Sequence, residues 1–333
     1  MILITGGAGF IGSHMAGFLL SKDIDFVLLD NFSNSNTNNI SLLESFFKKK
    51  IKILNVDLRN ISHVENLFHK YNFSSVIHFA ALKSVEESIK YSNLYFDNNV
   101  SGSKNLINII KKFKIKNFIF SSSACVYGEP NYLPIDEDHP LNPSNPYAQS
   151  KADVENLILF DKYFIDDCRT SILRYFNPIG SFFDHIIGEN PIKVPSNLMP
   201  YIVGVSLKIF PYLKIFGDDY KTNDGTAIRD YVHVMDLVEA HYAVLNLAKV
   251  GVQVYNIGTG NGISVRQLLF KFGEINNVQV PFKIYPRRAG DSGAVYSSVN
   301  KINKKLNWRA RFNLDDMCRD AYLFAQKNIK KKV

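Results

Sequence analysis

The chain has little cysteine, and no metal-binding pattern accompanies it. Its 333 residues include three cysteines, Cys125, Cys168 and Cys318, which are odd in number and far apart. Such a set builds no disulfide framework, matches no zinc-ligand spacing and is typical of a reducing compartment. The eight histidines are scattered as well. We therefore expect a cytoplasmic protein that has no disulfides and no catalytic metal.

Acidic and basic residues are absent from positions 1–21, so a signal peptide has to be considered. This stretch lacks the basic segment with which signal peptides begin, and glycines at 6, 7, 9 and 12 interrupt its apolar run. No other segment has the length and apolar character of a membrane span. We expect neither a signal peptide nor a membrane-embedded protein.

The basic residues form no concentrated patch, although the formal net charge is +8. Lysines lie in small groups at 48–50, 111–112, 304–305 and 330–332. A nucleic-acid-binding protein instead gathers its basic residues on one face or along one helix. We interpret the lysine groups as exposed helix ends and a frayed C-terminus, and we expect no nucleic-acid partner.

The N-terminal stretch does contain the pattern of a strand, a glycine-rich turn and a helix. Residues 1–5 are apolar like a buried strand, glycines follow at 6, 9 and 12, and an apolar helical pattern runs to residue 20. Glycine lets the backbone turn tightly and lets a diphosphate approach the N–H groups at the start of the helix. Because the spacing differs slightly from the commoner dinucleotide fingerprint, the interpretation depends on its context.

Strand and helix patterns alternate through the first half, which predicts a parallel sheet covered by helices on both faces. The predicted fold class is α/β, a Rossmann-type doubly wound parallel sheet with a smaller mixed α/β substrate-binding domain. The predicted strands are 1–5, 26–29, 51–56, 75–80, 117–122 and 170–175, and the predicted helices include 61–70 and 91–113.

Polar residues follow several of these strands, at the edge where parallel sheets bind ligands. Asp30 ends the second strand, and a carboxylate there can accept hydrogen bonds from an adenosine ribose. It would repel a 2′-phosphate, so NAD is favoured over NADP. The alternative is that Asp30 only holds the turn at the strand end. The other strand ends carry Asp57, Ala80 to Lys83, Ser121 to Ser123 and Tyr175 to Asn177.

Residues 145–151 read Asn-Pro-Tyr-Ala-Gln-Ser-Lys and predict the start of a catalytic helix. Asn145 can cap the helix, Pro146 suits its first turn, and Tyr147 and Lys151 then share one face. A free tyrosine ionises at about pH 10, and a neighbouring ammonium favours the phenolate. Most such pairs taken alone are surface features. The glycine turn, and a Ser123 hydroxyl that can relay a proton to the phenol, favour a general base.

These motifs resemble those of the extended short-chain dehydrogenases/reductases, and four further segments resemble the UDP-glucose 4-epimerases. Those segments are FSSSACVYG at 120–128, RYFNPIG at 174–180, NLMPYI at 197–202 and GTAIRDYVHVMDL at 225–237. The similarity covers nearly the whole chain, and together the motifs are highly specific. Related dehydratases carry Thr-Asp-Glu where this chain has Ser123-Ala124-Cys125, which argues against elimination of water.

The resemblance implies a role for each residue of the site, and it implies a homodimer. Tyr147 is implied to be the base and acid, Lys151 its electrostatic partner and a ribose ligand, and Ser123 the hydroxyl that shares the proton. The implied NAD ligands are Gly6, Gly9, Phe10, Ile11, Gly12, Asp30, Asn31, Asp57, Leu58, Phe79, Ala80, Lys83, Asn98, Ser121, Tyr147, Lys151 and Tyr175. The implied UDP-sugar ligands are Ser123, Asn177, Asn197, Leu198, Phe216, Arg229, Tyr231, Arg288, Asp291 and Val295.

The chemistry of three of these residues agrees with a UDP-sugar. Guanidinium groups of Arg229 and Arg288 can clamp a pyrophosphate by charge-assisted hydrogen bonds, and Phe216 can pack on a uracil face. Two alternatives stay open. Arg229 could form a buried salt bridge with Asp230 or Asp236, and Arg288 could simply be exposed to solvent.

One position bears on which sugar is accepted. In the resembling family, the residue four beyond the position of Asp291 limits the room beside the C2 substituent of the sugar. We align Val295 there, and a side chain smaller than tyrosine implies that UDP-GlcNAc and UDP-GalNAc are also accepted. A shift of one residue would place Tyr296 there and reverse this expectation.

The two predicted domains are interleaved. The alternation of strand and helix patterns weakens after Tyr175 and returns from about residue 231 to residue 258. We assign 1–175 and 231–258 to an NAD-binding domain, and 176–230 and 259–330 to a UDP-sugar-binding domain. The predicted function is NAD-dependent epimerisation at C4 of a UDP-hexose through a 4-keto intermediate. The alternatives are a sugar-nucleotide reductase or dehydrogenase of the same family and a non-enzymatic dinucleotide sensor.

Overall fold

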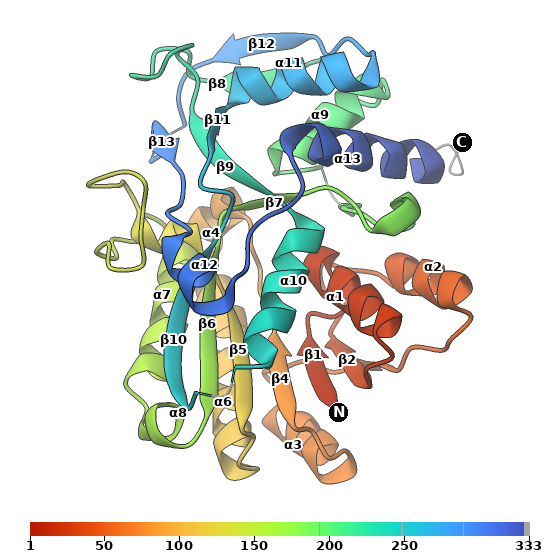
Figure 1. Ribbon diagram of the computed structural model, residues 1–333, viewed down its shortest axis with the longest axis vertical. Coiled ribbons are helices and arrows are strands. Elements are labelled where there is room, and N and C mark those ends of the chain that lie inside the picture. Colours follow the sequence, from red (N-terminus) through yellow and green to blue (C-terminus); the bar gives the residue numbers. More distant parts are fainter. Residues whose placement is uncertain (193, 248, 289, 330–333) are drawn as a thin grey trace. The chain divides into compact units, whose positions relative to one another are not determined.

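The computed structural model describes residues 1–192, 194–247, 249–288 and 290–329 (Figure 1). The chain forms two compact units. Unit 1 consists of Met1–Gly128, Pro140–Tyr175 and Ala240–Tyr255, and unit 2 consists of Glu129–His139, Phe176–Glu239 and the chain from Asn256 onward.

Unit 1 contains a seven-stranded sheet in which the pairs β1–β2, β1–β4, β2–β3, β4–β5 and β5–β6 are all parallel. The strand order leads outward from β1 in both directions, which places a topological switch point between β1 and β4. In sheet order the strands are β10 (Gly251–Ile257), β6 (Arg169–Tyr175), β5 (Asn117–Ser123), β4 (Ser75–His78), β1 (Ile2–Thr5), β2 (Phe26–Asp30) and β3 (Ile53–Asn55).

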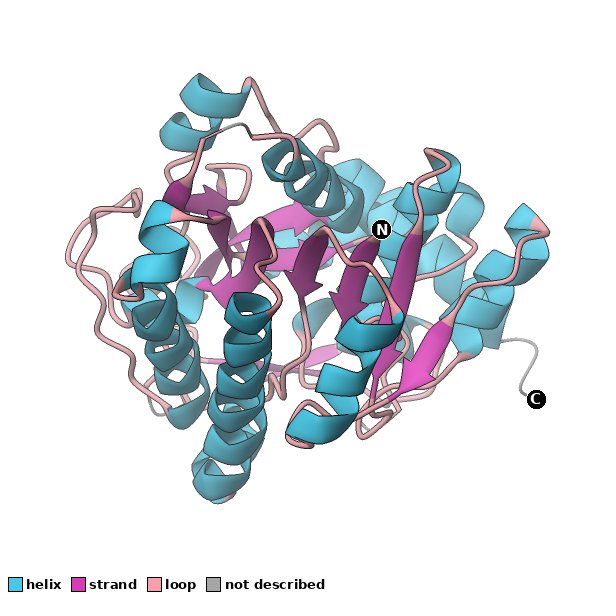
Figure 2. Cartoon of the chain, turned by 90° about the horizontal axis from the view of Figure 1, so that it is seen from below, coloured by secondary structure: helices cyan, strands magenta, loops and turns pink. Residues whose placement is uncertain are grey.

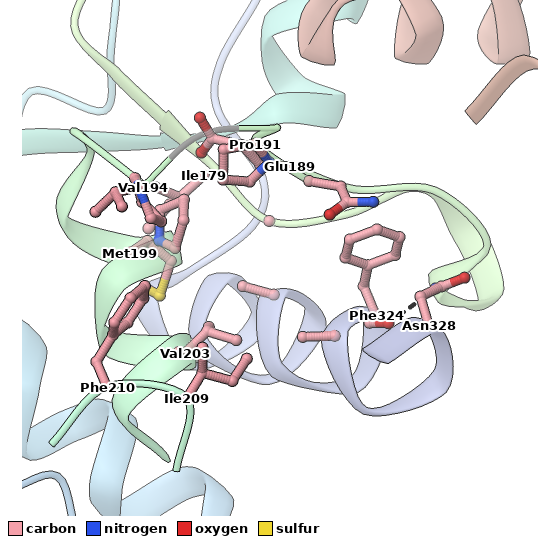
Figure 3. A pocket seen from close by; sticks show the side chains of 17 residues that line it. Ile179, Glu189, Pro191, Val194, Met199, Val203, Ile209, Phe210, Phe324 and Asn328 are labelled. Carbon is pink, nitrogen blue, oxygen red and sulfur yellow. Dashed lines mark hydrogen bonds between the residues drawn. The ribbon is translucent and has the colours of Figure 1, made fainter. Parts of the chain in front are cut away.

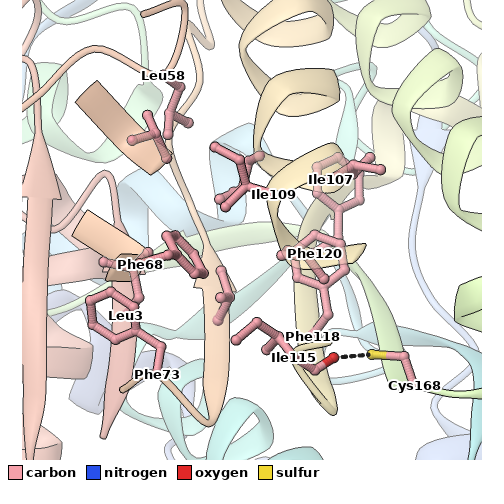
Figure 4. Packing of buried hydrophobic residues seen from close by; sticks show 14 of the residues in the cluster. Leu3, Leu58, Phe68, Phe73, Ile107, Ile109, Ile115, Phe118, Phe120 and Cys168 are labelled. Carbon is pink, nitrogen blue, oxygen red and sulfur yellow. Dashed lines mark hydrogen bonds between the residues drawn. The ribbon is translucent and has the colours of Figure 1, made fainter. Parts of the chain in front are cut away.

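Helices cover both faces of this sheet, as Figure 2 shows. On one face, α3, α6 and α7 share an apolar cluster with the strands, to which Leu106, Ile158 and Val76 belong. Figure 4 shows Phe68, Ile107 and Phe118 of this cluster. On the other face α1 contacts α10, where the rings of Phe18 and Tyr242 lie 5.4 Å apart. The helices are α1 (Phe10–Ser21), α2 (Asn38–Phe47), α3 (Ile61–Lys70), α4 (Val85–Lys90), α5 (Ser92–Tyr95), η1 (Phe96–Ser101), α6 (Gly102–Lys112), η2 (Ala124–Tyr127), α7 (Pro146–Leu159), α8 (Lys162–Asp166) and α10 (Val234–Leu245).

Unit 2 is built around β9, which pairs with three other strands. It runs parallel to β7 and β13 and antiparallel to β11, and a separate parallel pair joins β8 to β12. Helices α9, α11 and α13 share an apolar core with these strands. The elements are β7 (Asn177–Ile179), η3 (Phe183–His185), α9 (Leu198–Ser206), β8 (Leu213–Phe216), β9 (Ile228–His233), β11 (Gly262–Ser264), α11 (Val265–Asn276), β12 (Phe282–Tyr285), β13 (Ala294–Val295), α12 (Asn300–Leu306) and α13 (Leu314–Ile329).

The boundary between the units differs from the predicted domain boundary in three places. Residues 231–239 and 256–258 belong to unit 2, and residues 231–233 of this set are part of β9, which pairs with β7, β11 and β13 of that unit. Residues 129–139 also belong to unit 2. There the Ile135 N–H donates to the Tyr296 carbonyl at 2.9 Å, and the Ser298 N–H donates to the Ile135 carbonyl at 2.6 Å.

Most predicted elements of unit 1 are present, with ends that differ by a few residues. The predicted helix 91–113 is a near-continuous run of α5, the π-helical η1 and α6. Within the described ranges, no helix combines the length and the apolar character needed to cross a membrane.

Candidate active site

The glycine turn between β1 and α1 packs so closely that side chains are excluded from it. Gly6 has φ +68°, and a Cβ there would lie 2.6 Å from the Ala80 nitrogen. A Cβ on Gly12 would lie 2.2 Å from the Gly6 carbonyl oxygen. Both positions therefore require glycine, and their bare backbone forms a cradle that fits a dinucleotide diphosphate.

The start of α1 also suits an anion. The helix begins at Phe10, after an extended Gly9, and neither a side-chain cap nor an acidic residue in the first turn occupies its N-terminus. The N–H groups of Phe10, Ile11 and Gly12 therefore point out of the helix end with its partial positive charge.

Asp30 holds the neighbouring turn in place. Its Oδ1 accepts hydrogen bonds from the Phe32 N–H at 2.9 Å and the Ser35 hydroxyl at 2.7 Å, and its Oδ2 accepts from the Ala8 N–H at 2.9 Å. The turn-holding alternative for Asp30 is thus part of its role. A carboxylate has about four acceptor positions, so one on Oδ2 is left for a ribose hydroxyl.

Asn31, Asp57 and Arg59 form a connected group at the ends of β2 and β3. Asn31 Nδ2 donates to Asp57 Oδ2 at 2.9 Å, and the Arg59 guanidinium binds both carboxylate oxygens of Asp57 at 2.8 and 3.0 Å. These bonds from Arg59 hold the pKa of Asp57 far below its usual range. Leu58 is buried beside this group.

After β4, the backbone is tied to helices by a residue that the sequence analysis missed. Asn99 accepts a hydrogen bond from the Leu82 N–H at 2.8 Å and donates to the Leu82 carbonyl and to Ser150, both at 3.0 Å. Its neighbour Asn98 donates to Asn99 at 3.0 Å. Of the predicted NAD ligands here, Phe79 and Ala80 are half-buried and Lys83 is exposed.

The catalytic helix α7 begins as the sequence predicts. Asn145 Oδ1 accepts from the Ala148 N–H at 2.9 Å, and Pro146 occupies the first turn. Lys151 is buried, and its ammonium donates to the Ser121 carbonyl at 2.8 Å. Burial lowers the pKa of Lys151 to about 7, although the nearby Glu155 carboxylate acts in the opposite direction.

The pKa of Tyr147 is shifted in the direction opposite to the expected effect of a neighbouring ammonium. Burial, and then the Cys125 thiol, raise the pKa of Tyr147 above its ordinary value, whereas a hydrogen bond with the Ser123 side chain lowers it. Lys151 is not among the groups that shift it, because its ammonium is directed to Ser121. Desolvation outweighs the Ser123 hydrogen bond, and a cationic charge close to the phenol would act in the opposite direction to desolvation.

Tyr175 and His241 lie in the same region of unit 1. Their side chains are hydrogen-bonded through the phenol and Nε2, and the His241 ring lies 4.9 Å from the Phe79 ring. Burial raises the pKa of Tyr175, the nearby Tyr147 raises it further, and a hydrogen bond with Ser121 lowers it. No sequence signal indicated His241, because it comes from α10, more than sixty residues later.

A buried ion pair supports the serines at the end of β5. Arg174 binds both carboxylate oxygens of Glu155, at 2.7 and 3.1 Å, and donates to the Tyr127 hydroxyl at 3.0 Å. The Ser122 hydroxyl donates to the same carboxylate at 2.5 Å. This network therefore fixes β5, β6, η2 and α7 around Ser123 and Lys151. Glu155 follows Lys151 by one helical turn, a spacing that could have indicated it.

In unit 2, strand pairing brings four predicted substrate residues together. Asn177 of β7 pairs with Tyr231 of β9, and Val295 of β13 pairs with Arg229 of β9. Because Arg229 and Tyr231 are two residues apart in one strand, their side chains lie on the same face. Tyr231 is buried, and its hydroxyl has no hydrogen-bond partner among the described residues.

Arg229 pairs with Asp291 and not with Asp230 or Asp236. Its Nη2 donates to Asp291 Oδ1 at 2.5 Å, and its Nη1 donates to the carbonyls of Ile228 and Ser292 at 2.8 and 3.0 Å. Asp230 instead accepts from Thr259, Gly260 and Ser297, and Asp236 accepts from the Arg311 and Phe312 N–H groups. A guanidinium has five N–H groups, so Arg229 retains donors for a ligand oxygen.

Phe216 and Arg288 form a stacked pair. The guanidinium carbon of Arg288 lies 3.9 Å from the centre of the Phe216 ring, and Arg288 is exposed, as its alternative interpretation expected. Asn177 and Asn197 are exposed as well, and Leu198 opens α9. Asn197 Nδ2 donates to Glu189 at 2.7 Å.

The register of β13 separates the two candidates for the specificity position. Tyr296 points toward β11, since a Cβ on Gly262 would lie 3.1 Å from its ring. Gly262 pairs with Asp230, which alternates with Arg229 along β9. Val295 therefore shares the face of Arg229 and Tyr231, and Tyr296 lies on the opposite face.

A pocket of unit 2 does not coincide with these residues (Figure 3). Its volume is about 310 Å³, and apolar side chains such as Met199, Phe210 and Phe324 line it. Its lining includes Glu189, the hydrogen-bond partner of Asn197. Among the described residues, no group of three or more His, Cys, Asp or Glu side chains could hold a metal ion.

Comparison with known proteins adds a family to this geometry. Residues 3–321 match the sequence model of the GDP-mannose 4,6 dehydratase family. The bifunctional UDP-glucose 4-epimerase and UDP-xylose 4-epimerase 3 of Arabidopsis thaliana is 42% identical, over 98% of this chain and 95% of that protein.

Two solved structures extend the similarity to the fold. UDP-glucose 4-epimerase from Bifidobacterium longum, in complex with NAD+ and UDP, is 40% identical with a TM-score of 0.94, over 98% of both chains. The UDP-Glc/GlcNAc 4-epimerase from Campylobacter jejuni is 34% identical with a TM-score of 0.84, over 98% of this chain and 99% of that one.

Proposed function

The chain belongs to the UDP-glucose 4-epimerases of the NAD-dependent epimerase/dehydratase family, and on that premise we propose that it interconverts the C4 epimers of a UDP-hexose with NAD as cofactor. The observation that carries this proposal is the full-length similarity to epimerases, combined with the glycine cradle and the Tyr147, Lys151 and Ser123 group in unit 1. The dehydratase chemistry of the matched family model is not proposed, because Ser123-Ala124-Cys125 lacks its acids.

The residues of unit 1 fit NAD. Gly6 and Gly12 leave room for the diphosphate, Asp30 keeps an acceptor position for a ribose hydroxyl, and Lys151 is the proposed ligand of the second ribose. When bound, NAD supplies a hydride acceptor that returns the hydride in the same catalytic cycle.

The chain's own residues then handle the proton and the substrate. Tyr147 takes the proton of the sugar 4-hydroxyl through or beside Ser123 and later returns it to the opposite epimer. In unit 2, Arg229 and Arg288 bind the diphosphate, and Phe216 packs on the uracil. The nucleotide stays fixed while the 4-keto sugar rotates. Tyr147 can therefore exchange the proton with either C4 epimer.

The test is turnover of UDP-galactose by the purified protein without added NAD. We expect conversion to UDP-glucose and no net NADH in solution, because the redox change closes in each cycle. Stoichiometric NADH would indicate the reductase or dehydrogenase alternative. Bound NAD without any turnover would indicate the sensor.

We also propose that N-acetylated UDP-hexoses are substrates. The support is the position of Val295 on the face of Arg229 and Tyr231, where its small side chain leaves room that a tyrosine would fill. The Campylobacter relative is a UDP-Glc/GlcNAc 4-epimerase, which is consistent with this breadth.

Substitution of Val295 by tyrosine tests that proposal within one protein. We expect the Val295→Tyr variant to lose activity on UDP-GalNAc and to keep it on UDP-galactose. Wild-type protein that converts UDP-galactose but leaves UDP-GalNAc unchanged would refute the proposal.

The homodimer and the cytoplasmic location are also proposals. Exposed apolar residues on α4 and α5, among them Ile89 and Leu94, are consistent with a covered surface. None of the three cysteines forms a disulfide, and Cys168 and Cys318 are buried, which suits a reducing compartment. Sedimentation analysis of the purified protein decides the first, and fluorescence imaging of a tagged chain decides the second.

A further inference from the structure

Tyr220 lies in unit 2 among the predicted substrate residues, although no sequence motif indicated it. We propose that Tyr220 is a further UDP-binding residue, whose ring holds the substrate-binding segments together and whose hydroxyl donates a hydrogen bond to the diphosphate. This inference rests on the proposed function and adds a residue to its substrate site.

The ring of Tyr220 is wedged between two glycines. A Cβ on Gly217 would lie 2.6 Å from its Cε2, and a Cβ on Gly293 would lie 3.4 Å from its Cδ1, so the glycines face opposite edges of the ring. Gly217 directly follows Phe216, and Gly293 lies between Asp291 and Val295. The ring therefore sets the spacing of the segments that carry three predicted UDP-sugar ligands.

A third segment packs on the face of the same ring. The Arg287 guanidinium carbon lies 4.1 Å from the ring centre, and its Nε is held by Asp219 at 2.7 Å. Arg288, which stacks on Phe216, is the next residue. The backbone of Tyr220 is fixed too, because its N–H donates to the Gly225 carbonyl at 2.9 Å.

The hydroxyl of Tyr220 is buried, yet it has no hydrogen-bond partner among the described residues. A buried hydroxyl is normally satisfied, and leaving one unpaired costs free energy. Arg229 and Asp291 are among the charged groups that act on it, since Asp291 raises and Arg229 lowers the pKa of a phenol that burial already raises. The unused donor therefore lies within the electrostatic reach of the Arg229–Asp291 pair, in which Arg229 retains donors for a ligand oxygen.

The chemistry of this position points to a phosphate rather than to the nucleoside. A phenol O–H is an uncharged hydrogen-bond donor. The acceptor that a neighbouring arginine would bring to it is an anionic oxygen, such as that of a diphosphate. The Tyr231 hydroxyl is also buried and has no hydrogen-bond partner among the described residues, and Arg229 and Asp291 act on its pKa as well. Two such hydroxyls and one guanidinium provide convergent donors for a diphosphate.

Tyr220→Phe tests the hydroxyl because it keeps the ring. We expect the dissociation constant of UDP to rise about tenfold, with uridine affinity changed less than about twofold, by calorimetry or competition. The KM for UDP-galactose should rise with kcat little changed. The melting temperature should not fall, since no internal hydrogen bond is lost. Tyr322→Phe, a buried tyrosine of α13, is the matched control and should bind UDP like wild type.

Unchanged UDP affinity in Tyr220→Phe would overturn the inference, and so would an equal loss for UDP and uridine. A clear fall in melting temperature would also overturn it, because the hydroxyl would then have a partner within the chain. Wild-type protein that neither binds UDP nor converts UDP-galactose would instead refute the proposed function itself.

Discussion

The candidate residues of unit 1 and those of unit 2 differ in how far their polar groups are already bonded within the protein. In unit 1, Asp30 accepts three hydrogen bonds, Lys151 donates to Ser121, and Glu155 is held by Arg174. In unit 2, Arg288 is exposed, and the hydroxyls of Tyr220 and Tyr231 have no partner within the described ranges.

This difference matches the two ligands. Side chains that are already fixed by the protein, as in unit 1, suit a cofactor that stays bound, because binding then orders few further side chains. Hydrogen-bond donors that are not yet used, as in unit 2, suit a substrate that enters and leaves in every turnover. If this comparison holds, substitutions in unit 1 should change stability and NAD content, and substitutions in unit 2 should change UDP affinity.

The largest effect should come from breaking the buried ion pair of unit 1. Glu155→Ala leaves the Arg174 charge buried without its partner, which typically costs about 3–5 kcal/mol. Urea unfolding measures this loss. Lys49→Ala, which removes an exposed ion pair with Asp23, is the control and should change little. Similar small losses in both variants would show that the network is not structurally important.

The glycine cradle should be the next most sensitive feature. Gly12→Ala forces a Cβ against the Gly6 carbonyl, and such overpacking typically costs about 1–3 kcal/mol. We expect the NAD content of the purified protein to fall about tenfold or more. Gly9→Ala is the milder comparison, because its Cβ would lie 3.3 Å from the same oxygen. Equal NAD content in both variants would contradict a close-fitting cradle.

Acid should lower the stability of the folded chain through a buried histidine of unit 1. His78 lies between the Thr5 and Ser103 hydroxyls, each 2.7 Å from a ring nitrogen, and burial lowers its pKa to about 3. The unfolded chain takes up this proton below about pH 6.5, whereas the folded chain does not. Stability from this group is therefore complete above pH 6.5 and is lost as the pH falls toward 3, by about 1.4 kcal/mol per pH unit.

A His78→Gln variant removes this titration and should unfold with a shallower pH dependence between pH 6 and about 4. His63→Gln, at an exposed position of α3, is the matched substitution. The same slope for wild type and His78→Gln would contradict a neutral, buried His78.

The smallest effect should appear in unit 2. Phe216→Leu keeps an apolar side chain but removes the aromatic face that stacks with Arg288, an interaction worth about 0.5–1.5 kcal/mol. We expect UDP affinity to fall by a corresponding factor of about 2 to 12, while NAD content stays at the wild-type level. Loss of NAD from this variant would contradict the assignment of NAD binding to unit 1 and of UDP binding to unit 2.

The sequence predicts best where structure depends on neighbouring residues. The turn at Gly6 to Gly12 and the cap of α7 at Asn145 are local, and the structure contains both as expected. The helix at 61–70 is present with the same ends. Local spacing carries enough information for these features because backbone sterics and capping act within a few residues.

Features that depend on distant pairing were missed or misplaced. The sequence assigns 231–239 to the first domain, yet β9 pairs with β7, β11 and β13 of unit 2. His241 and Tyr220 join the site through packing that no spacing reveals. Burial raises the pKa of Tyr147, an effect that the expectation from neighbouring charges did not include.

The central claim is that Tyr147 moves the proton while other residues hold the cofactor, and Tyr147→Phe measures it most directly. We expect UDP-galactose turnover to fall by about 10²- to 10⁴-fold, with the NAD content of the purified variant equal to that of wild type. Turnover close to the wild-type rate would show that another group is the base and would contradict this account.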